Sequence, residues 1–457
     1  MTESYSPSYK RSVLLISCLA AGLVPFMGSS INLSLPQIAR EYNMSSIGQS
    51  WILTSFLISS AIFQVPFGRL SDMVGRKRIF AYGLLLVSLS SAACILPYGG
   101  AFLIGCRVFQ GIGSAMSFST GMAILTAVFE PHERGKAMGI QVAVVYLSLA
   151  LGPSLGGFMM AQWGWHSIFY ATTAVSLLAY LGSRMVLKEQ EKEAKGEPFD
   201  VLGTVLFSLA LLMLIYGFTI LPSLLGFGLI MIGSVLFAGF IRYEKQLAHP
   251  VLNVRLFFTN RQFTLSSTAA FINYATTFPI AFFMSLYLQE VKGMEVQYAG
   301  LLLIIQPSVQ ALLSPIAGRL SDRISAHYLA SAGMGLLATG LLCIGLFITP
   351  DSPVAFIVVI LVLFGIGFAA FSSPNTNAIM SSVEKRDYST ASATTGTMRL
   401  TGQAFSMGLT TLVIALFLGK ERVSPELSAP FMQAMHVVFL LFAAISAVGI
   451  YASLARK

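Results

Sequence analysis

Charged residues are scarce in this sequence. Asp, Glu, Lys and Arg make up 10% of the 457 residues, whereas 55% are hydrophobic, and the mean hydropathy is +0.76. So few charged side chains cannot cover the surface of a soluble globular protein of this length. The composition therefore excludes a soluble globule and predicts an all-α, polytopic membrane protein.

Cysteine and histidine are also rare. The four cysteines lie within apolar runs, without paired spacing and without a histidine nearby in the sequence. The five histidines lie in loops or at expected helix ends, and the sequence has no Gly-Lys-Ser/Thr phosphate loop. We therefore expect no metal site, no cofactor and no enzymatic activity.

Apolar runs long enough to cross a membrane, which takes about 20 residues, recur along the whole chain. We expect fourteen transmembrane helices, at residues 12–35, 48–68, 78–97, 101–126, 136–160, 166–187, 200–220, 222–241, 262–289, 297–318, 327–349, 354–375, 389–419 and 430–454. The first run follows Lys10 and Arg11 but has no small-x-small cleavage site, so we interpret it as an uncleaved span.

The basic residues outside these spans fall mainly on one side of the membrane. With fourteen spans both termini share a side, and only Arg40, Lys292, Lys420 and Arg422 fall on the opposite side. By the positive-inside rule the termini are cytoplasmic, in a multi-pass protein of the cell membrane in contact with its lipids. The formal net charge of +9 is then a result of topology, and we expect no nucleic-acid partner.

A charged stretch from Lys188 to Pro198 divides the chain. It ends a first six-helix bundle (1–187) and leads into a segment with two additional transmembrane helices (188–261), which is followed by a second six-helix bundle (262–457). We expect the two bundles to form pseudo-symmetric halves of a monomer.

A repeated motif supports the two halves. Gly68-Arg-Leu-Ser-Asp72 continues to Gly75 and Arg76, and its first five residues recur from Gly318 to Asp322. Glycine allows two helix ends to approach closely, and a carboxylate stabilises the N-terminus of a neighbouring helix. We predict that Asp72 meets the helix that begins near Ser389, and that Asp322 meets the helix that begins near Gly135.

These residues resemble the loop between the second and third helices of the major facilitator superfamily. The two additional helices make the chain similar to the fourteen-span drug:proton antiporter branch of that superfamily. The resemblance implies a secondary-active transporter in which two halves rock about a central site, driven by a proton gradient.

Two further segments carry the resemblance. Arg107 and Gln110 share one face of the fourth expected helix, and an intramembrane arginine costs roughly 2.5–3.5 kcal/mol, which favours a functional role over snorkelling to the outer interface. The fifth helix contains a glycine-proline motif similar to that of antiporters, formed by Gly152, Pro153, Gly156 and Gly157. We expect it to bend the helix and to pack closely against another helix.

The carrier of the proton is not evident. No carboxylate lies deep in a span, and Met27 stands where the family's first-helix acid is expected, ahead of Asn32. We assign coupling to Arg107 and Gln110, with Glu130 or Glu290 as the acid that Arg107 would hold ionised.

Polar side chains within the spans mark an expected substrate cavity among many Phe and Met residues. The candidates are Asn32, Gln64, Asn273, Tyr274, Gln306, Gln310 and Arg399. Arg399 faces either the cavity or Asp72. A wide apolar cavity suits amphipathic, weakly specified compounds, so proton-coupled multidrug-type efflux by alternating access is the leading hypothesis. The alternative is an importer or facilitator of an organic anion, indicated by the two intramembrane arginines.

Overall fold

The computed structural model describes residues 5–44, 46–189, 194–419 and 427–455, and within them the chain is helical without a strand. The helices of the first half are α1 (Pro7–Glu41), α2 (Ser46–Val74), α3 (Arg76–Ala93), α4 (Gly100–Val128), α5 (Pro131–Trp163) and α6 (His166–Val186). Two helices follow them, α7 (Val201–Thr219) and α8 (Leu224–Glu244). The second half contains α9 (Leu256–Thr259), α10 (Arg261–Thr277), α11 (Pro279–Leu286), α12 (Val296–Leu303), α13 (Ile305–Ser321), α14 (Ala326–Phe347), α15 (Val354–Ser381), α16 (Tyr388–Leu418) and α17 (Ser428–Leu454).

Twelve helical segments in the described chain are long and apolar enough to cross a membrane, so this count does not reach the fourteen expected from the sequence. The two expected spans outside the twelve, 78–97 and 166–187, do form helices, namely α3 and α6. Neither contains a stretch apolar enough to count among the twelve. α3 has 18 residues and begins with three basic residues, and α6 has Arg184 in its last turn.

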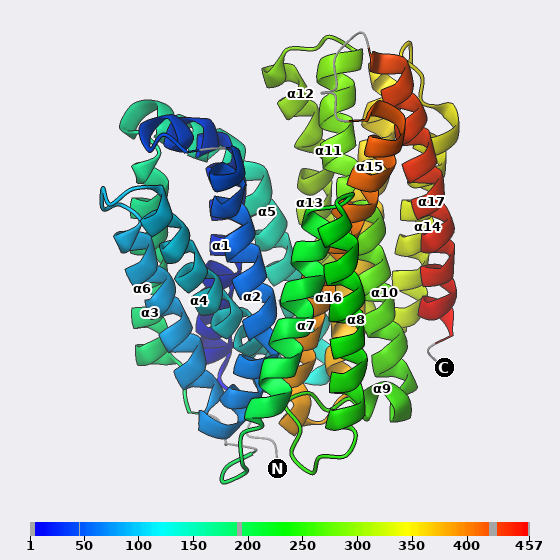
Figure 1. Cartoon of the computed structure of the whole chain (residues 1–457). Coiled ribbons are helices and arrows are strands. Elements are labelled where there is room, and N and C mark those ends of the chain that lie inside the picture. Colours follow the sequence, from blue (N-terminus) through cyan, green and yellow to red (C-terminus); the bar gives the residue numbers. More distant parts are fainter. Residues whose placement is uncertain (1–4, 45, 190–193, 420–426, 456–457) are drawn as a thin grey trace.

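The helices form two bundles that lie side by side (Figure 1). α1 packs on α5 and α6, and α4 on α2 and α3, whereas α14 packs on α15 and α17 in the other bundle. The bundles meet along α2 and α16, α4 and α16, and α5 and α13. We call this boundary the seam.

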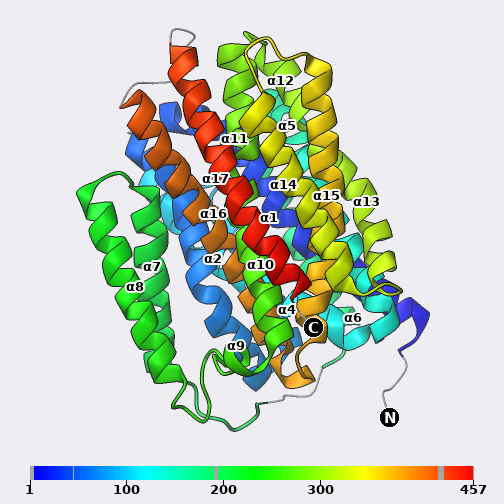
Figure 2. The ribbon, with the colours of Figure 1, turned by 90° about the vertical axis from the view of Figure 1, so that its right-hand side faces the viewer.

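α7 and α8 pack against each other and stand at the edge of the molecule (Figure 2). α7 contacts α2 of the first half and α16 of the second. The inserted pair therefore lies over the seam and touches both halves.

Close packing between α1 and α5 follows from the glycine-proline motif. The Ser30 hydroxyl donates to the Gly152 carbonyl over 3.0 Å, and a Cβ on Gly156 would lie 2.4 Å from Ser30 Oγ. Only glycine permits this approach. The predicted tight contact is thus confirmed, whereas Pro153 is exposed and lies away from it.

Candidate functional site

The two copies of the repeated motif, Gly68–Arg78 and Gly318–Arg323, lie at the same end of the molecule, which we call the motif end. In the first copy Gly75 joins α2 to α3 with a φ of 119°, a conformation that favours glycine. Gly68 faces α16 so closely that an added Cβ would lie 2.9 Å from the Cβ of Ala393. The glycines therefore bring the motif against the opposite half.

Arg76 and Asp72 form a buried ion pair in the first copy. Arg76 Nη2 donates to Asp72 Oδ1 over 2.9 Å and to the Lys385 carbonyl over 2.6 Å, and Arg76 Nε donates to Ser389 Oγ over 2.8 Å. Asp72 therefore lies beside the start of α16, as expected, but Arg76 rather than a backbone N–H group bridges the two halves.

In the second copy the carboxylate itself crosses the seam. The amides of Gly135 and Lys136, near the start of α5, donate to Asp322 Oδ1 over 2.8 Å and to Oδ2 over 3.0 Å. The predicted contact of Asp322 is confirmed. Burial raises the pKa of Asp322, against the opposing effect of these two hydrogen bonds.

The helices approach most closely where Gly135 meets Gly318. A Cβ on Gly318 would lie 2.2 Å from the Gly135 carbonyl oxygen, and a Cβ on Gly135 would lie 2.4 Å from that of Gly318. Backbone on both sides leaves no room for a side chain. The seam is thus closed at the motif end by backbone contact together with charged hydrogen bonds.

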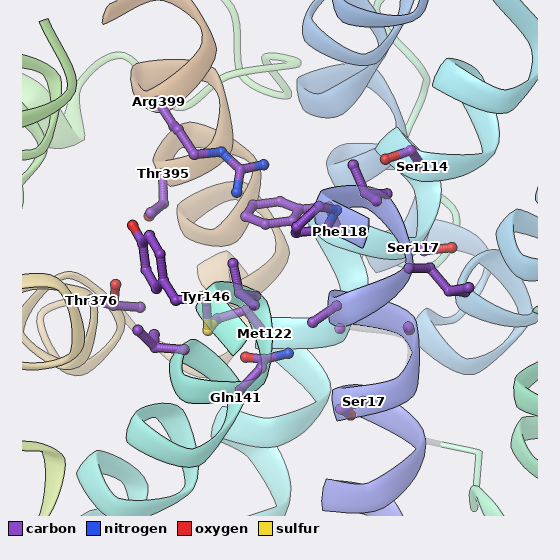
Figure 3. Close-up of a pocket in the computed structure, with 18 of the residues that line it drawn as sticks. Ser17, Ser114, Ser117, Phe118, Met122, Gln141, Tyr146, Thr376, Thr395 and Arg399 are labelled. Atoms are coloured by element: carbon purple, nitrogen blue, oxygen red, sulfur yellow. The ribbon is translucent and has the colours of Figure 1, made fainter. Parts of the chain in front are cut away.

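A central cavity with a volume of about 100 Å³ lies between the halves. Figure 3 shows its lining side chains, which come from both halves. The polar ones are Ser17, Ser114, Ser117, Gln141, Tyr146, Tyr274, Ser372, Thr376, Thr395 and Arg399, and the rest are apolar, including Phe80, Phe118 and Met122.

Arg399 is the only lining residue with a charged side chain. Its guanidinium carbon lies 4.4 Å from the centre of the Phe118 ring, which belongs to the opposite half (Figure 3). No carboxylate of the described residues forms an ion pair with it. Of the two positions expected for Arg399, the structure therefore shows the cavity and not the neighbourhood of Asp72. The site combines one cation with aromatic faces.

Of the seven predicted cavity residues, Tyr274 and Arg399 line the cavity and the other five do not. Asn32 is exposed on α1, and Gln64 and Asn273 are buried in helix contacts. Gln306 donates to Gln310 over 2.9 Å, so these two amides bind each other. The reason is that helices apolar on all sides give no sequence signal for the face that turns inward.

The sequence prediction missed most of the polar lining. Ser114 and Ser117 are one turn apart on α4 and share a face with Gly121, all three at the cavity. That spacing of small residues three and four apart was the available signal. No such sequence signal marked Tyr146 and Thr395, since single hydroxyls are common in membrane helices.

Arg107 is 1% exposed and is satisfied within the first half. Its guanidinium donates to the Ile52 carbonyl over 2.9 Å and to Gln110 Oε1 over 2.8 Å, and it lies 4.4 Å from the Phe56 ring centre. Gln110 in turn donates to Ser91 Oγ over 2.7 Å. The arginine therefore joins α2 to α4 and does not snorkel outward.

The structure does not bring Glu130 to Arg107. Glu130 accepts from Lys10 Nζ over 3.2 Å at the motif end. Arg107 lies near the opposite end of α4, which is continuous from Gly100 to Val128, and 1.5 Å per residue keeps the two roughly 30 Å apart. The hypothesis that Arg107 controls Glu130 by direct pairing is corrected by this geometry.

Comparisons with known proteins agree with this architecture. A family model described as Major Facilitator Superfamily matches residues 17–259 and 266–456. The riboflavin transporter RibZ of Clostridioides difficile (strain 630) is 29% identical over 389 residues, 83% of either chain. Multidrug resistance protein Stp of Mycobacterium tuberculosis (strain CDC 1551 / Oshkosh) is 28% identical over 431 residues, 90% of this chain and 79% of Stp. The solved structure of the proton:xylose symporter XylE has a TM-score of 0.71 at 14% identity, covering 98% of this chain and 95% of that one, which shows a shared fold.

The seam contact predicts the effect of Gly318→Ala. The new Cβ would meet the Gly135 carbonyl, so α5 and α13 must separate, and overpacking of this kind costs about 1–3 kcal/mol. In a variant without native cysteines, maleimide labelling of Asn377→Cys, buried at the motif end, should accelerate at least fivefold. Gly335→Ala is the matched control, since nothing lies within 4 Å of its added Cβ. Equal labelling rates in both variants would show that the contact does not hold the seam closed.

Proposed function

Because the chain belongs to the Major Facilitator Superfamily, we propose that it is a secondary-active transporter that exports amphipathic small molecules in exchange for protons. The observation that carries the proposal is the central cavity, which is lined by both halves and lies behind a seam that is closed at the motif end. Rocking of the halves would open that end and close the other, which is alternating access.

The proposed orientation follows from charge. The basic residues of the motif end, including Arg69, Arg76 and Lys77, make it the cytoplasmic side of the cell membrane under the positive-inside rule. With this orientation, the structure would correspond to an outward-facing conformation. The halves are proposed to comprise residues 1–187 and 262–457, with 188–261 as the inserted segment.

The cavity lining favours neutral and anionic aromatic substrates over lipophilic cations. Apolar side chains dominate the lining, so binding energy would come mainly from burial of apolar surface. Arg399 contributes a positive charge that no lining carboxylate balances. A cation would be repelled by Arg399, whereas an acidic aromatic compound could pair with it and stack on Phe118.

The second candidate is import or facilitated diffusion of an organic anion, and the same arginine favours it. The relative named as a riboflavin transporter is consistent with a planar aromatic substrate, and the relative named as a multidrug resistance protein is consistent with export. The two candidates differ in direction and in their requirement for a proton gradient.

Transport by purified protein in proteoliposomes tests both candidates. With an imposed proton gradient, we expect transport of fluorescein, an aromatic anion, to exceed that of ethidium, an aromatic cation. Arg399→Gln should reduce fluorescein transport about tenfold or more, since a charge-assisted hydrogen bond contributes about 1.5–3 kcal/mol, and Arg399→Lys should restore part of it.

Fluorescein movement that needs no proton gradient would select the facilitator over the exporter. Ethidium transport that is unaffected by Arg399→Gln and exceeds fluorescein transport would contradict the proposed preference for anions.

We also propose that α3 and α6 cross the membrane, which gives fourteen spans. Support comes from α3, which runs antiparallel to α4: Gly83 lies against Ser117, Val87 against Gly113, and Ser91 binds Gln110. α6 adjoins α3 at the same depth, where the Ser88 hydroxyl donates to the Thr173 carbonyl. A helix that follows a spanning neighbour along its length spans as well.

Cysteine labelling from outside intact cells tests the topology. Gly99, between α3 and α4, and Gly164, between α5 and α6, should be labelled by an impermeant maleimide when replaced by cysteine, whereas Gly75→Cys should not. Labelling of Gly75 and Gly99 from the same side would exclude a spanning α3.

A further inference from the structure

Two acidic residues lie close together at the motif-end tips of α7 and α8, and the proposed transport cycle does not use them. Glu244 is the last residue of α8 and is 0% exposed. Asp200 immediately precedes α7 and caps it. Asp200 is half-buried, and its Oδ2 atom is buried.

The two carboxyl groups face each other across Gly203. A Cβ added to Gly203 would lie 2.0 Å from Asp200 Oδ2 and 2.1 Å from Glu244 Oε1, so the two oxygens are within about 4 Å of each other. Both oxygens are buried, and neither has a hydrogen-bond partner in the described chain. Two ionised carboxylates this close would repel each other strongly, and a proton between them removes the repulsion.

The remaining oxygens indicate which group carries the charge. Asp200 Oδ1 accepts from the Gly203 amide over 2.9 Å and from the Tyr243 hydroxyl over 3.4 Å, at the positive end of α7. Glu244 Oε2 accepts from the Leu252 amide over 3.2 Å and does not lie at the N-terminus of a helix. Asp200 is therefore the better stabilised anion, and Glu244 the better proton donor.

The basic groups around the pair are bound elsewhere. Arg69 and His249 both pair with Glu197. Arg255 donates to the Lys245 carbonyl, and the Lys245 ammonium lies over the Phe258 ring. Arg386 pairs with Glu384 and Asp387. Within the described residues, Tyr243 is the one other titratable group that faces the pair. Among the described residues no cation therefore substitutes for the proton.

We propose that Asp200 and Glu244 form a proton-binding site in the inserted helix pair, with one proton held between Glu244 Oε1 and Asp200 Oδ2. Binding transfers a proton from water to the carboxylate pair, and release returns it, with no other bond changed. The central cavity offers no carboxylate for a proton, so this site is separate from the substrate site.

The site is connected to the seam by packing. The segment that Glu244 holds through Leu252 packs with Val65 of α2 and Ala393 of α16, together with Phe207 and Phe240 of the inserted pair. Ala393 also faces Gly68 of the motif. Loss of the proton would place two like charges in contact and loosen this segment. The charge on Asp200 and Glu244 would therefore influence how α7 and α8 contact the two halves.

Infrared difference spectroscopy of the purified protein in lipid nanodiscs tests the site without any substrate. At neutral pH we expect a protonated-carboxyl band that shifts in deuterated buffer, disappears in Glu244→Gln and changes frequency in Asp200→Asn. Glu197→Gln is the matched control, since Glu197 is ion-paired with Arg69, and it should leave the band unchanged.

Hydrogen exchange of residues 251–254 gives a second measurement. It should accelerate at alkaline pH in the parent protein beyond the intrinsic pH effect, but not in Glu244→Gln, whose amide can donate to Asp200 permanently. An unchanged carboxyl band in both Glu244→Gln and Asp200→Asn would overturn the proposal, as would equal alkaline acceleration in the parent and Glu244→Gln.

Discussion

The contact on which this structure depends is the meeting of two helix backbones at Gly135 and Gly318. Without side chains at these positions α5 and α13 touch, and only at that separation can Asp322 reach the amides at the start of α5. The related contact of Gly68 with α16 allows Arg76 to reach Ser389 and Lys385. Steric fit and charge thus act together, since each requires the other for the seam to close.

The two copies of the motif reach the same result by different chemistry. Asp322 binds backbone amides directly, whereas Asp72 positions an arginine that makes the contacts. The difference follows from the sequence, because the position of Arg76 in the first copy corresponds to Ala326 in the second. Replacing the carboxylate should therefore act directly in one copy and through Arg76 in the other.

The sequence predicted the parts of the structure that are governed by local rules. The repeat placed Asp322 at α5, and the glycine-proline motif predicted a close helix contact that the structure shows against α1. The orientation of side chains around apolar helices was not predictable, since nothing distinguishes the inward face of α2 or α10 before packing is known. Gln64 and Asn273 were therefore assigned to the cavity, and Tyr146 and Thr395 were missed. The burial of Glu244 has no signal in the sequence, because it arises where the segment after α8 folds back over this residue and removes it from water.

Charged side chains lie in separate places in this structure: Arg399 at the central cavity, Arg107 between α2 and α4, Arg76 and Asp322 at the seam, and Asp200 with Glu244 at the motif-end tips of α7 and α8. The seam lies between the first and the last of these. In the proposed transport cycle the seam opens as the opposite end closes, because one rigid movement of the halves would do both.

Double electron–electron resonance measures that movement most directly. Spin labels at Arg78 and Arg323 report the motif end, and labels at Tyr98 and Asp351 report the opposite end, with one label of each pair on either half. On addition of a transported substrate, we expect a population in which the distance at the motif end lengthens while the distance at the opposite end shortens. Two distances that lengthen together, or that both stay fixed during active transport, would contradict alternating access by movement of the halves.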